Sequence, residues 1–166
     1  PRGLRGRASV APKAKLQVVC VGKVKPPFDA AVSDYEGRIA AFTSFRSDEV
    51  AVAPTGSGDV TAMRKEAERL RGKVVAGALI VAVDPGGRAA KSSPAFGAWL
   101  GRHMETGRSV SFLIGGPLGL DRELLAAADE SLSLGPLTMP HQLARVVLAE
   151  QLYRALATAA GHPYSR

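Results

Sequence analysis

Two short stretches in the last third of the chain each run directly into a loop rich in glycine and proline. The first is residues 109–114, which precede the loop 115–119, and the second is residues 131–134, which precede the loop 135–140. Short, largely apolar runs bounded by such loops are typical of buried β-strands. The loops bring backbone N–H and C=O groups to the ends of neighbouring strands, where α/β proteins bind small molecules. The layout predicts an α/β chain with a ligand pocket at one edge of its sheet.

Strand patterns alternate with helical patterns from residue 15 onward. We predict strands at 15–21, 48–53, 78–83, 109–114 and 131–134, and helices at 28–42, 59–71, 93–105, 121–130 and 141–160. Strands that alternate with helices of about ten residues or more favour a mostly parallel sheet with helices on both faces. We expect five to six strands, with the almost entirely apolar third and fourth strands at the centre of the sheet. The segment 54–58 is predicted to be a surface loop.

Several helix ends carry signals of their own. Ser93 precedes Pro94 and is predicted to cap the third helix, with proline at the first helical position. Asp121 is predicted to cap the fourth helix. The last helix is expected to stop at Gly161, with Pro163 just beyond.

The composition indicates one domain with a substantial core. The chain has 166 residues, of which 46% are hydrophobic and 22% charged, and we assign the domain to residues 15–166. No apolar run approaches the ~20 residues of a membrane-spanning helix, so no membrane partner is expected. The one cysteine, Cys20, lies inside an apolar run and is expected to be a buried strand residue in a reducing compartment.

Most of the positive charge lies at the N-terminus. Residues 1–15 carry five basic residues and no acid, so subtracting their +5 from the net charge of +7 leaves +2 for residues 16–166. We predict a basic, flexible N-terminal extension at residues 1–14. It could be a phosphate-binding arm, the remnant of a transit peptide or an extension without a role. The expected location is cytoplasmic, or organellar if the extension is such a remnant.

The sequence lacks the motifs that several common enzyme chemistries require. The three histidines have no metal-ligand spacing and a lone cysteine offers no zinc cluster, so no metal is expected. The chain has no P-loop, dinucleotide fingerprint or nucleophile elbow. A cleft lined by backbone remains, in which Gly116 lets a ligand approach closely and the loop 135–140 can read the edge of a purine. Either loop alone could be an ordinary tight turn, but two in tandem favour a ligand site.

The helix at 141–160 combines an apolar surface with basic side chains. His141 and Arg145 are four residues apart and project from one side, while Arg154 lies about half a rotation away. Glu150 and Arg154 are also four apart and are expected to form an exposed pair. Apolar residues spread round most of the helix, which indicates burial by its own sheet and by a second subunit.

The tail after this helix gathers an imidazole, a phenol and a guanidinium within five residues: His162, Tyr164 and Arg166. These groups offer a titratable ring, a stacking ring and a phosphate fork. On the residues alone, such a terminus would be expected to fray and to be inert.

Six blocks of the sequence resemble, in order, the small bacterial-type methyltransferases that methylate N3 of a pseudouridine in large-subunit ribosomal RNA. That family belongs to the knotted SPOUT class of S-adenosylmethionine enzymes. The blocks cover nearly the whole chain from Lys15 and lie at residues 15–23, 81–87, 112–119, 137–141, 145–155 and 162–164.

The resemblance implies a SPOUT-like fold with a C-terminal trefoil knot, a homodimer, and S-adenosylmethionine as methyl donor, with S-adenosylhomocysteine as product. The residues implied for donor binding are Val83, Gly116, Leu134, Gly135, Pro136, Leu137, Thr138, Met139 and Pro140. The residues implied to face the RNA and the reacting base are His141, Arg145, Arg154, His162, Tyr164 and Arg166.

The predicted function is therefore S-adenosylmethionine-dependent methylation of N3 of a pseudouridine in large-subunit ribosomal RNA, on assembled ribosomes. One alternative is a knotted methyltransferase for a different RNA nucleoside. Another is a non-catalytic RNA-binding or ribosome-assembly factor, which would need a basic surface but no donor pocket.

Overall fold

The computed structural model describes residues 15–54, 56 and 58–165 of the chain. Its strands are β1 (Leu16–Val21), β2 (Phe45–Val50), β3 (Leu79–Ala89), β4 (Val110–Ile114) and β5 (Glu130–Ser133). Its helices are α1 (Phe28–Ala40), α2 (Asp59–Lys73), α3 (Ser93–Glu105), α4 (Arg122–Ala127) and α5 (His141–Ala159), followed by the short 3₁₀ turn η2 (Pro163–Ser165). The predicted extension at residues 1–14 lies outside the described residues.

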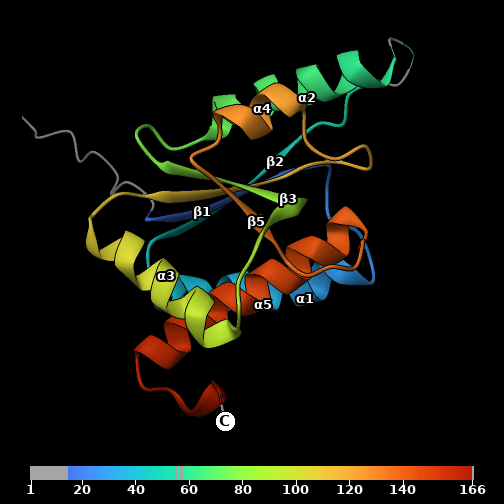
Figure 1. Ribbon diagram of the computed structural model, residues 1–166. Helices are drawn as coiled ribbons and strands as arrows, with labels where there is room; N and C mark the ends of the chain where they lie inside the picture. Colours follow the sequence, from blue (N-terminus) through green and yellow to red (C-terminus); the bar gives the residue numbers. More distant parts are fainter. Residues whose placement is uncertain (1–14, 55, 57, 166) are drawn as a thin grey trace, which may run out of the picture.

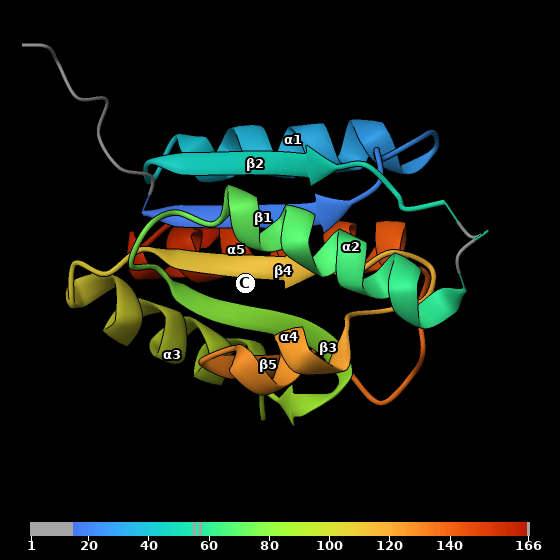
Figure 2. The ribbon, with the colours of Figure 1, turned by 90° about the horizontal axis from the view of Figure 1, so that it is seen from above.

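The strands form one parallel sheet in the order β2-β1-β4-β3-β5. The arrowheads of β1, β2 and β4 point to the same side in Figure 2, so the carboxyl ends of the strands meet at one edge. Helices α2 and α4 cover one face of the sheet, and α1, α3 and α5 cover the other (Figure 1). The predicted α/β fold is confirmed, including the internal positions of β3 and β4. The trefoil knot that the resemblance implies stays a prediction.

Alternation along β1 explains why helices are needed on both faces. Leu16, Val18 and Cys20 belong to the core against α1, α3 and α5, whereas Val19 and Val21 belong to the core against α2 and α4. All five side chains are at most 3% exposed. Because successive strand residues point to opposite faces, a strand buried on both sides reads as a continuous apolar run.

Strand β2 begins earlier than predicted, at Phe45 rather than residue 48, and ends at Val50. It lies at the edge of the sheet and pairs with β1 on one side, so its sequence need not be apolar. Because of this polar composition, the position of β2 does not coincide with an apolar run in the sequence. The predicted loop 54–58 joins β2 to α2, and residues 55 and 57 of that loop lie outside the described residues.

Strand β3 is longer than predicted and extends to Ala89. Its register with β5 shifts after Val83, where the chain bulges out, and pairing resumes with Arg88 opposite Leu132. A Cβ on Gly87 would lie 2.8 Å from the backbone nitrogen of Leu132, so this close approach requires glycine. The bulge leaves residues 84–87 without register partners on β5, and Asp84 and Pro85 line the cavity described below.

The capping signals agree with the structure except at α3, although α4 ends at Ala127 rather than at the predicted residue 130. The Asp121 carboxylate accepts hydrogen bonds from two backbone N–H groups in the first turn of α4, as predicted. The cap of α3 is Ser92 rather than Ser93, because Ser92 has the extended backbone of an N-cap and its hydroxyl accepts from the Ala95 N–H at 3.2 Å. Gly161 ends α5 with a φ of 72°, a conformation that favours glycine.

Helix α5 finds cover within its own chain. It packs between α1 and α3 and against β4, and no residue from 141 to 157 is exposed. Its apolar circumference therefore does not require a second subunit, which corrects the reason that the sequence suggested for one. In the described part of the chain, no helix is long and apolar enough to cross a membrane.

Cys20 is buried in β1, as predicted, and we expect its thiol to be unreactive. Burial raises its pKa from 9.0 to about 12, against the opposing influence of the nearby Arg145 guanidinium. At pH 8 the thiolate fraction should be about 10³-fold lower than in the unfolded chain. Alkylation rates measured with and without denaturant test this, and equal rates would show that the β1 core opens readily.

Candidate functional site

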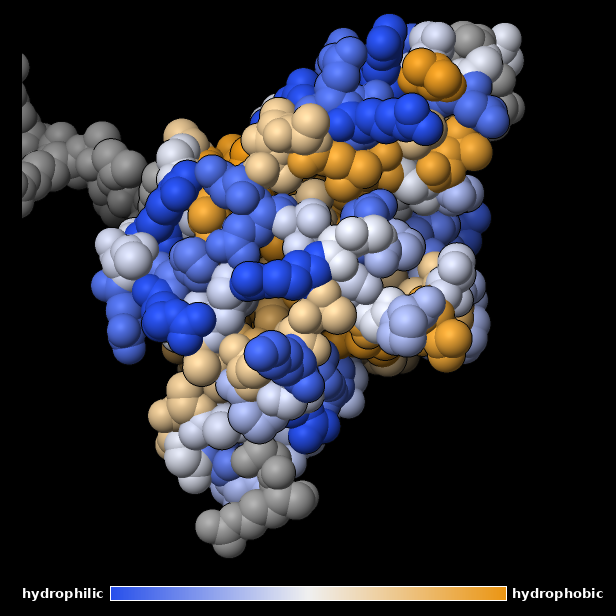
Figure 3. All heavy atoms as spheres, in the orientation of Figure 1, coloured by the Kyte–Doolittle hydropathy of each residue, from blue (hydrophilic) through white to orange (hydrophobic). Residues whose placement is uncertain are grey.

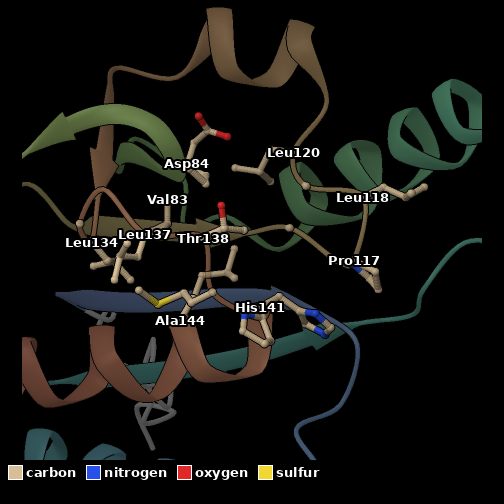
Figure 4. Close-up of a pocket in the computed structure, with 18 residues that line it drawn as sticks. Val83, Asp84, Pro117, Leu118, Leu120, Leu134, Leu137, Thr138, His141 and Ala144 are labelled. Carbon is tan, nitrogen blue, oxygen red and sulfur yellow. The ribbon is translucent and has the colours of Figure 1, made fainter.

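A cavity of about 570 Å³ lies at the carboxyl ends of β3, β4 and β5. Its walls are residues 83–85 at the bulge of β3, residues 114–120 from the last residue of β4 onward, and residues 134–135 and 137–141 after β5, with Ala144 from the first turn of α5. Figure 4 shows these segments converging on one space. In an open parallel sheet, the carboxyl edge is where ligands bind.

The donor-binding residues implied by the resemblance gather at this cavity. Eight of the nine line it: Val83, Gly116, Leu134, Gly135, Leu137, Thr138, Met139 and Pro140. The ninth, Pro136, is not among the lining residues. The cavity also takes in residues that the sequence reasoning left out, above all Asp84 and residues 117–120, although they directly follow implied residues in the chain.

Close backbone contacts shape the wall after β4. A Cβ on Gly115 would lie 2.5 Å from the carbonyl carbon of Gly119, so no side chain fits there. A Cβ on Gly116 would lie 3.0 Å from Val21 Cγ1 and 3.3 Å from Glu66 Oε2. Gly116 therefore fits closely against Val21 of β1 and Glu66 of α2 behind the cavity.

Three polar side chains line an otherwise apolar and backbone surface: Asp84, Thr138 and His141. Asp84 and His141 lie on opposite sides of the cavity, with Thr138 between them (Figure 4). Asp84 Oδ2 accepts a hydrogen bond from the Gly86 N–H at 2.8 Å, which holds the carboxylate in the β3 bulge. Burial lowers the pKa of His141 below its usual range, and the charge of Glu66 partly opposes this. His141 is therefore neutral near pH 7 and able to accept a proton.

The match of the chain to known proteins extends over almost its whole length. The profile of the family described as "Predicted SPOUT methyltransferase" matches residues 14–165. The chain belongs to the SPOUT methyltransferase family. The cavity in this family member is built from three of the sequence blocks that suggested the resemblance, at residues 81–87, 112–119 and 137–141.

Similar proteins cover most of the chain. A protein of Acidiphilium cryptum named Ribosomal RNA large subunit methyltransferase H is 43% identical over 158 residues, covering 94% of this chain and 96% of that one. A protein of the same name from Gluconacetobacter diazotrophicus is 44% identical over 151 residues, covering 91% and 97%. The crystal structure of a probable methyltransferase from Bordetella pertussis is 15% identical with a TM-score of 0.54, covering 86% and 96%, and supports the fold.

Arg145 of this SPOUT methyltransferase points into the protein rather than into the cavity. It is 6% exposed, and its Nη2 lies 3.1 Å from Glu36 Oε1 and 3.0 Å from Ser47 Oγ. Its Nη1 pairs with Glu49. Burial alone would raise the pKa of Glu49, but hydrogen bonds from Arg145 and from the Val24 N–H outweigh it and lower the pKa. We assign Arg145 a structural role, joining α5 to α1 and β2.

The tail folds back onto the middle of α5. Tyr164 packs edge-on against Tyr153 at 4.6 Å between ring centroids, and its hydroxyl lies 3.3 Å from both Tyr35 Oη and Glu150 Oε1. The hydrogen bond with Tyr35, burial and the charge of Glu150 raise the pKa of Tyr164 to about 12. The phenol therefore stays protonated at neutral pH.

Arg154 lies in the same cluster, and the exposed His162 accepts a hydrogen bond at Nδ1 from the Tyr164 N–H at 3.3 Å. Arg166 lies outside the described residues. Arg154 Nε donates to Glu150 Oε1 at 3.0 Å, forming the predicted pair, although it is half-buried rather than exposed. The Arg154 guanidinium also lies 5.2 Å from the centre of the Tyr164 ring. Glu150 is nine residues after His141, or about 13 Å along the helix. Within one chain, the cluster is thus separate from the cavity.

We expect Gly116→Val to reduce donor binding strongly. The added carbons would press on Val21 and Glu66 and displace the wall after β4. Calorimetric titration with S-adenosylmethionine, together with thermal unfolding, measures both effects. Gly101→Ala is the matched control, because a Cβ there meets nothing within 4 Å. Unchanged affinity in folded Gly116→Val would remove Gly116 from the site.

Proposed function

We propose that this protein transfers a methyl group from S-adenosylmethionine to N3 of a pseudouridine in large-subunit ribosomal RNA. The observation that carries the proposal is the cavity at the carboxyl edge of the sheet, lined by eight of the nine residues that the family resemblance implies for donor binding. The names of the relatives that match over more than nine-tenths of the chain support the RNA substrate.

The residues at the cavity fit S-adenosylmethionine. Apolar side chains such as Leu134, Leu137 and Met139 suit a purine ring, and the loop 134–140 offers backbone groups to its edge. Asp84 would suit a hydroxyl or ammonium group of the donor. When bound, the donor supplies a methyl group on a positively charged sulfur. The chain contributes position, since holding two reactants in line supplies much of the barrier reduction in such transfers.

The surface beside the cavity suits a second subunit, and we propose a homodimer. Leu137 is 78% exposed, Leu118 41% and Val52 50%, and all three follow strands at the carboxyl edge. Apolar surface gathers beneath the hydrophilic helices α2 and α4 in Figure 3. Large exposed apolar side chains that cluster in this way typically mark an interface. A two-fold interface here would bury them in both copies at once.

The dimer also gives the tail a place to act. The cluster of Arg154, His162 and Tyr164 is separate from the cavity of its own chain, so we propose that it reaches the base bound at the partner's cavity. A phenol kept protonated and a guanidinium can hold the oxygens of an imide ring. The basic extension at residues 1–14 would add affinity for RNA phosphates at low salt. With ribosomal RNA as substrate, the expected working location is the cytoplasm.

Two measurements test the proposal. Calorimetry should detect one binding site for S-adenosylmethionine per chain. A non-catalytic RNA-binding factor would lack this site. Labelled donor offered to assembled large ribosomal subunits and to naked ribosomal RNA should then label the assembled particle preferentially. Labelling of a different nucleoside would favour the alternative of a related methyltransferase with another target.

A further inference from the structure

Glu66 is a buried carboxylate with one unpaired oxygen. It lies on α2 and is 3% exposed. Its Oε1 accepts a hydrogen bond from the Ala53 N–H at 2.9 Å, whereas Oε2 is the one buried side-chain nitrogen or oxygen without a partner in the described part of the chain. Burying a carboxylate oxygen without a partner destabilises a protein. A neutral glutamine at position 66 could accept the hydrogen bond from the Ala53 N–H equally well. Folding alone therefore does not explain why this residue is a glutamate.

The unpaired oxygen lies against the wall of the donor cavity. A Cβ on Gly116, a lining residue, would be 3.3 Å from Glu66 Oε2 and 3.0 Å from Val21 Cγ1. His141 reaches the same strand end, because its Nε2 is 3.9 Å from the position of a Cβ on Gly22, the residue after Val21. The carboxylate from α2 and the imidazole from α5 thus both lie at the end of β1, the carboxylate beside Gly116 and the imidazole beside Gly22.

Few other charges act on this imidazole. Arg145, one turn further along α5, is paired with Glu49, and Lys23 acts on the same Glu49. Asp84 stands on the opposite side of the cavity (Figure 4). Glu66 is the charged group whose field acts on His141, where it favours the protonated ring against burial. The two residues have the relation of a carboxylate that steadies an imidazolium.

We propose that His141 accepts the proton of the target nitrogen and that Glu66 is a positioning residue that stabilises the resulting imidazolium. This rests on the methyl transfer proposed above. The electron pair of the broken N–H bond forms the new bond between nitrogen and methyl carbon. The bond between methyl and sulfur breaks with its pair going to sulfur, and the proton moves to the imidazole and later to water. The positive charge on the His141 imidazolium, which Glu66 stabilises, therefore develops as the positive charge on the donor sulfur is lost.

The decisive test needs no substrate. The Cε1 proton of His141 is titrated by NMR in the wild type, Glu66→Gln and Glu68→Gln, and is assigned by its absence from His141→Ala. Removing the charge of Glu66 should lower the pKa of His141 further, whereas Glu68 is exposed on the same helix and its change should have no effect. An unchanged pKa in folded Glu66→Gln would overturn the proposal. If that variant does not fold, Glu66→Asp replaces it. Its shorter side chain moves the carboxylate away from His141, so it must also lower the pKa of His141.

Single-turnover methylation across pH separates this inference from the proposed function. The rate should rise with pH as His141 loses its proton. In Glu66→Gln the rise should move to lower pH and the plateau should fall roughly 10-fold, and in His141→Ala the plateau should fall by about 10²–10⁴. A wild type that transfers no methyl group would contradict the proposed function while the NMR result stands. An active wild type whose pH profile is unchanged in Glu66→Gln would contradict this inference alone.

Discussion

Removal of residues 162–166 is expected to leave the affinity for S-adenosylmethionine nearly intact and to slow methyl transfer by about 10²–10⁴, the range that general acid–base and orienting groups supply. The reason is the separation of the two sites. The tail packs against Tyr153 and Glu150 in the middle of α5, whereas the donor cavity lies at the start of that helix. Calorimetry and single-turnover rates on the same preparation measure the two effects. A truncated protein that methylates at the full rate would show that the tail is inert.

Mixed dimers sharpen this prediction. A chain that lacks the tail and a chain that carries Gly116→Val are each expected to be inactive as homodimers. Combined, they should regain activity if the tail of one subunit serves the cavity of the other, because one of the two composite sites is then intact. No recovery in a mixed dimer would contradict a shared site. In single-turnover assays across pH, His141→Ala should lose the rise of the rate with pH, whereas His162→Ala should keep it.

Replacement of Arg145 by methionine is expected to destabilise the fold by about 3 kcal/mol or more. Removing one partner of a buried ion pair costs about 3–5 kcal/mol, because the remaining charge is left without compensation. Arg145→Met would leave the carboxylates of Glu36 and Glu49 without their positively charged partner, and these side chains are only 16% and 29% exposed. Such a loss is a large fraction of the 5–15 kcal/mol that typically stabilises a protein of this size. Denaturant unfolding measures it.

The control for this change is Arg64→Met, which breaks an exposed pair with Glu123 at 3.4 Å and should cost less than about 1 kcal/mol. The pH dependence gives a second check. The pKa of Glu49 is lowered from 4.5, so the stability that it contributes is present above pH 4.5 and is lost as the pH falls below that value. The Arg145→Met variant should lose this acid-side slope. Equal stability of wild type and variant would mean that the buried network is neutral in free energy.

The sequence predicted the fold closely because its signals are local. Buried strands such as β1 and β4 are apolar on both faces, and helix ends carry caps such as Asp121 that act within three residues. Edge strand β2 was misplaced by three residues, since one-sided pairing removes the demand for an apolar run. The extension of β3 past Val83 was not predicted, because it depends on contact with Leu132, which is distant in the chain.

The donor cavity could be predicted because its walls are the loops that directly follow strands. The environment of basic side chains could not, since it depends on partners far away in the sequence. Arg145 looked like an RNA-facing residue beside His141, yet its partner Glu36 is 109 residues distant. The unpaired oxygen of Glu66 leaves no mark in the sequence at all, because it depends on how α2 packs against Gly116.

Methylation of N3 of a pseudouridine can be tested on the ribosome itself. The protein is incubated with isotopically labelled S-adenosylmethionine and large ribosomal subunits that lack the modification. The nucleosides of the RNA are then separated and identified by mass spectrometry. We expect a single labelled product, a pseudouridine carrying the methyl group on N3, and no such product with Gly116→Val. Donor binding without any labelled nucleoside, or a label on another nucleoside, would contradict it.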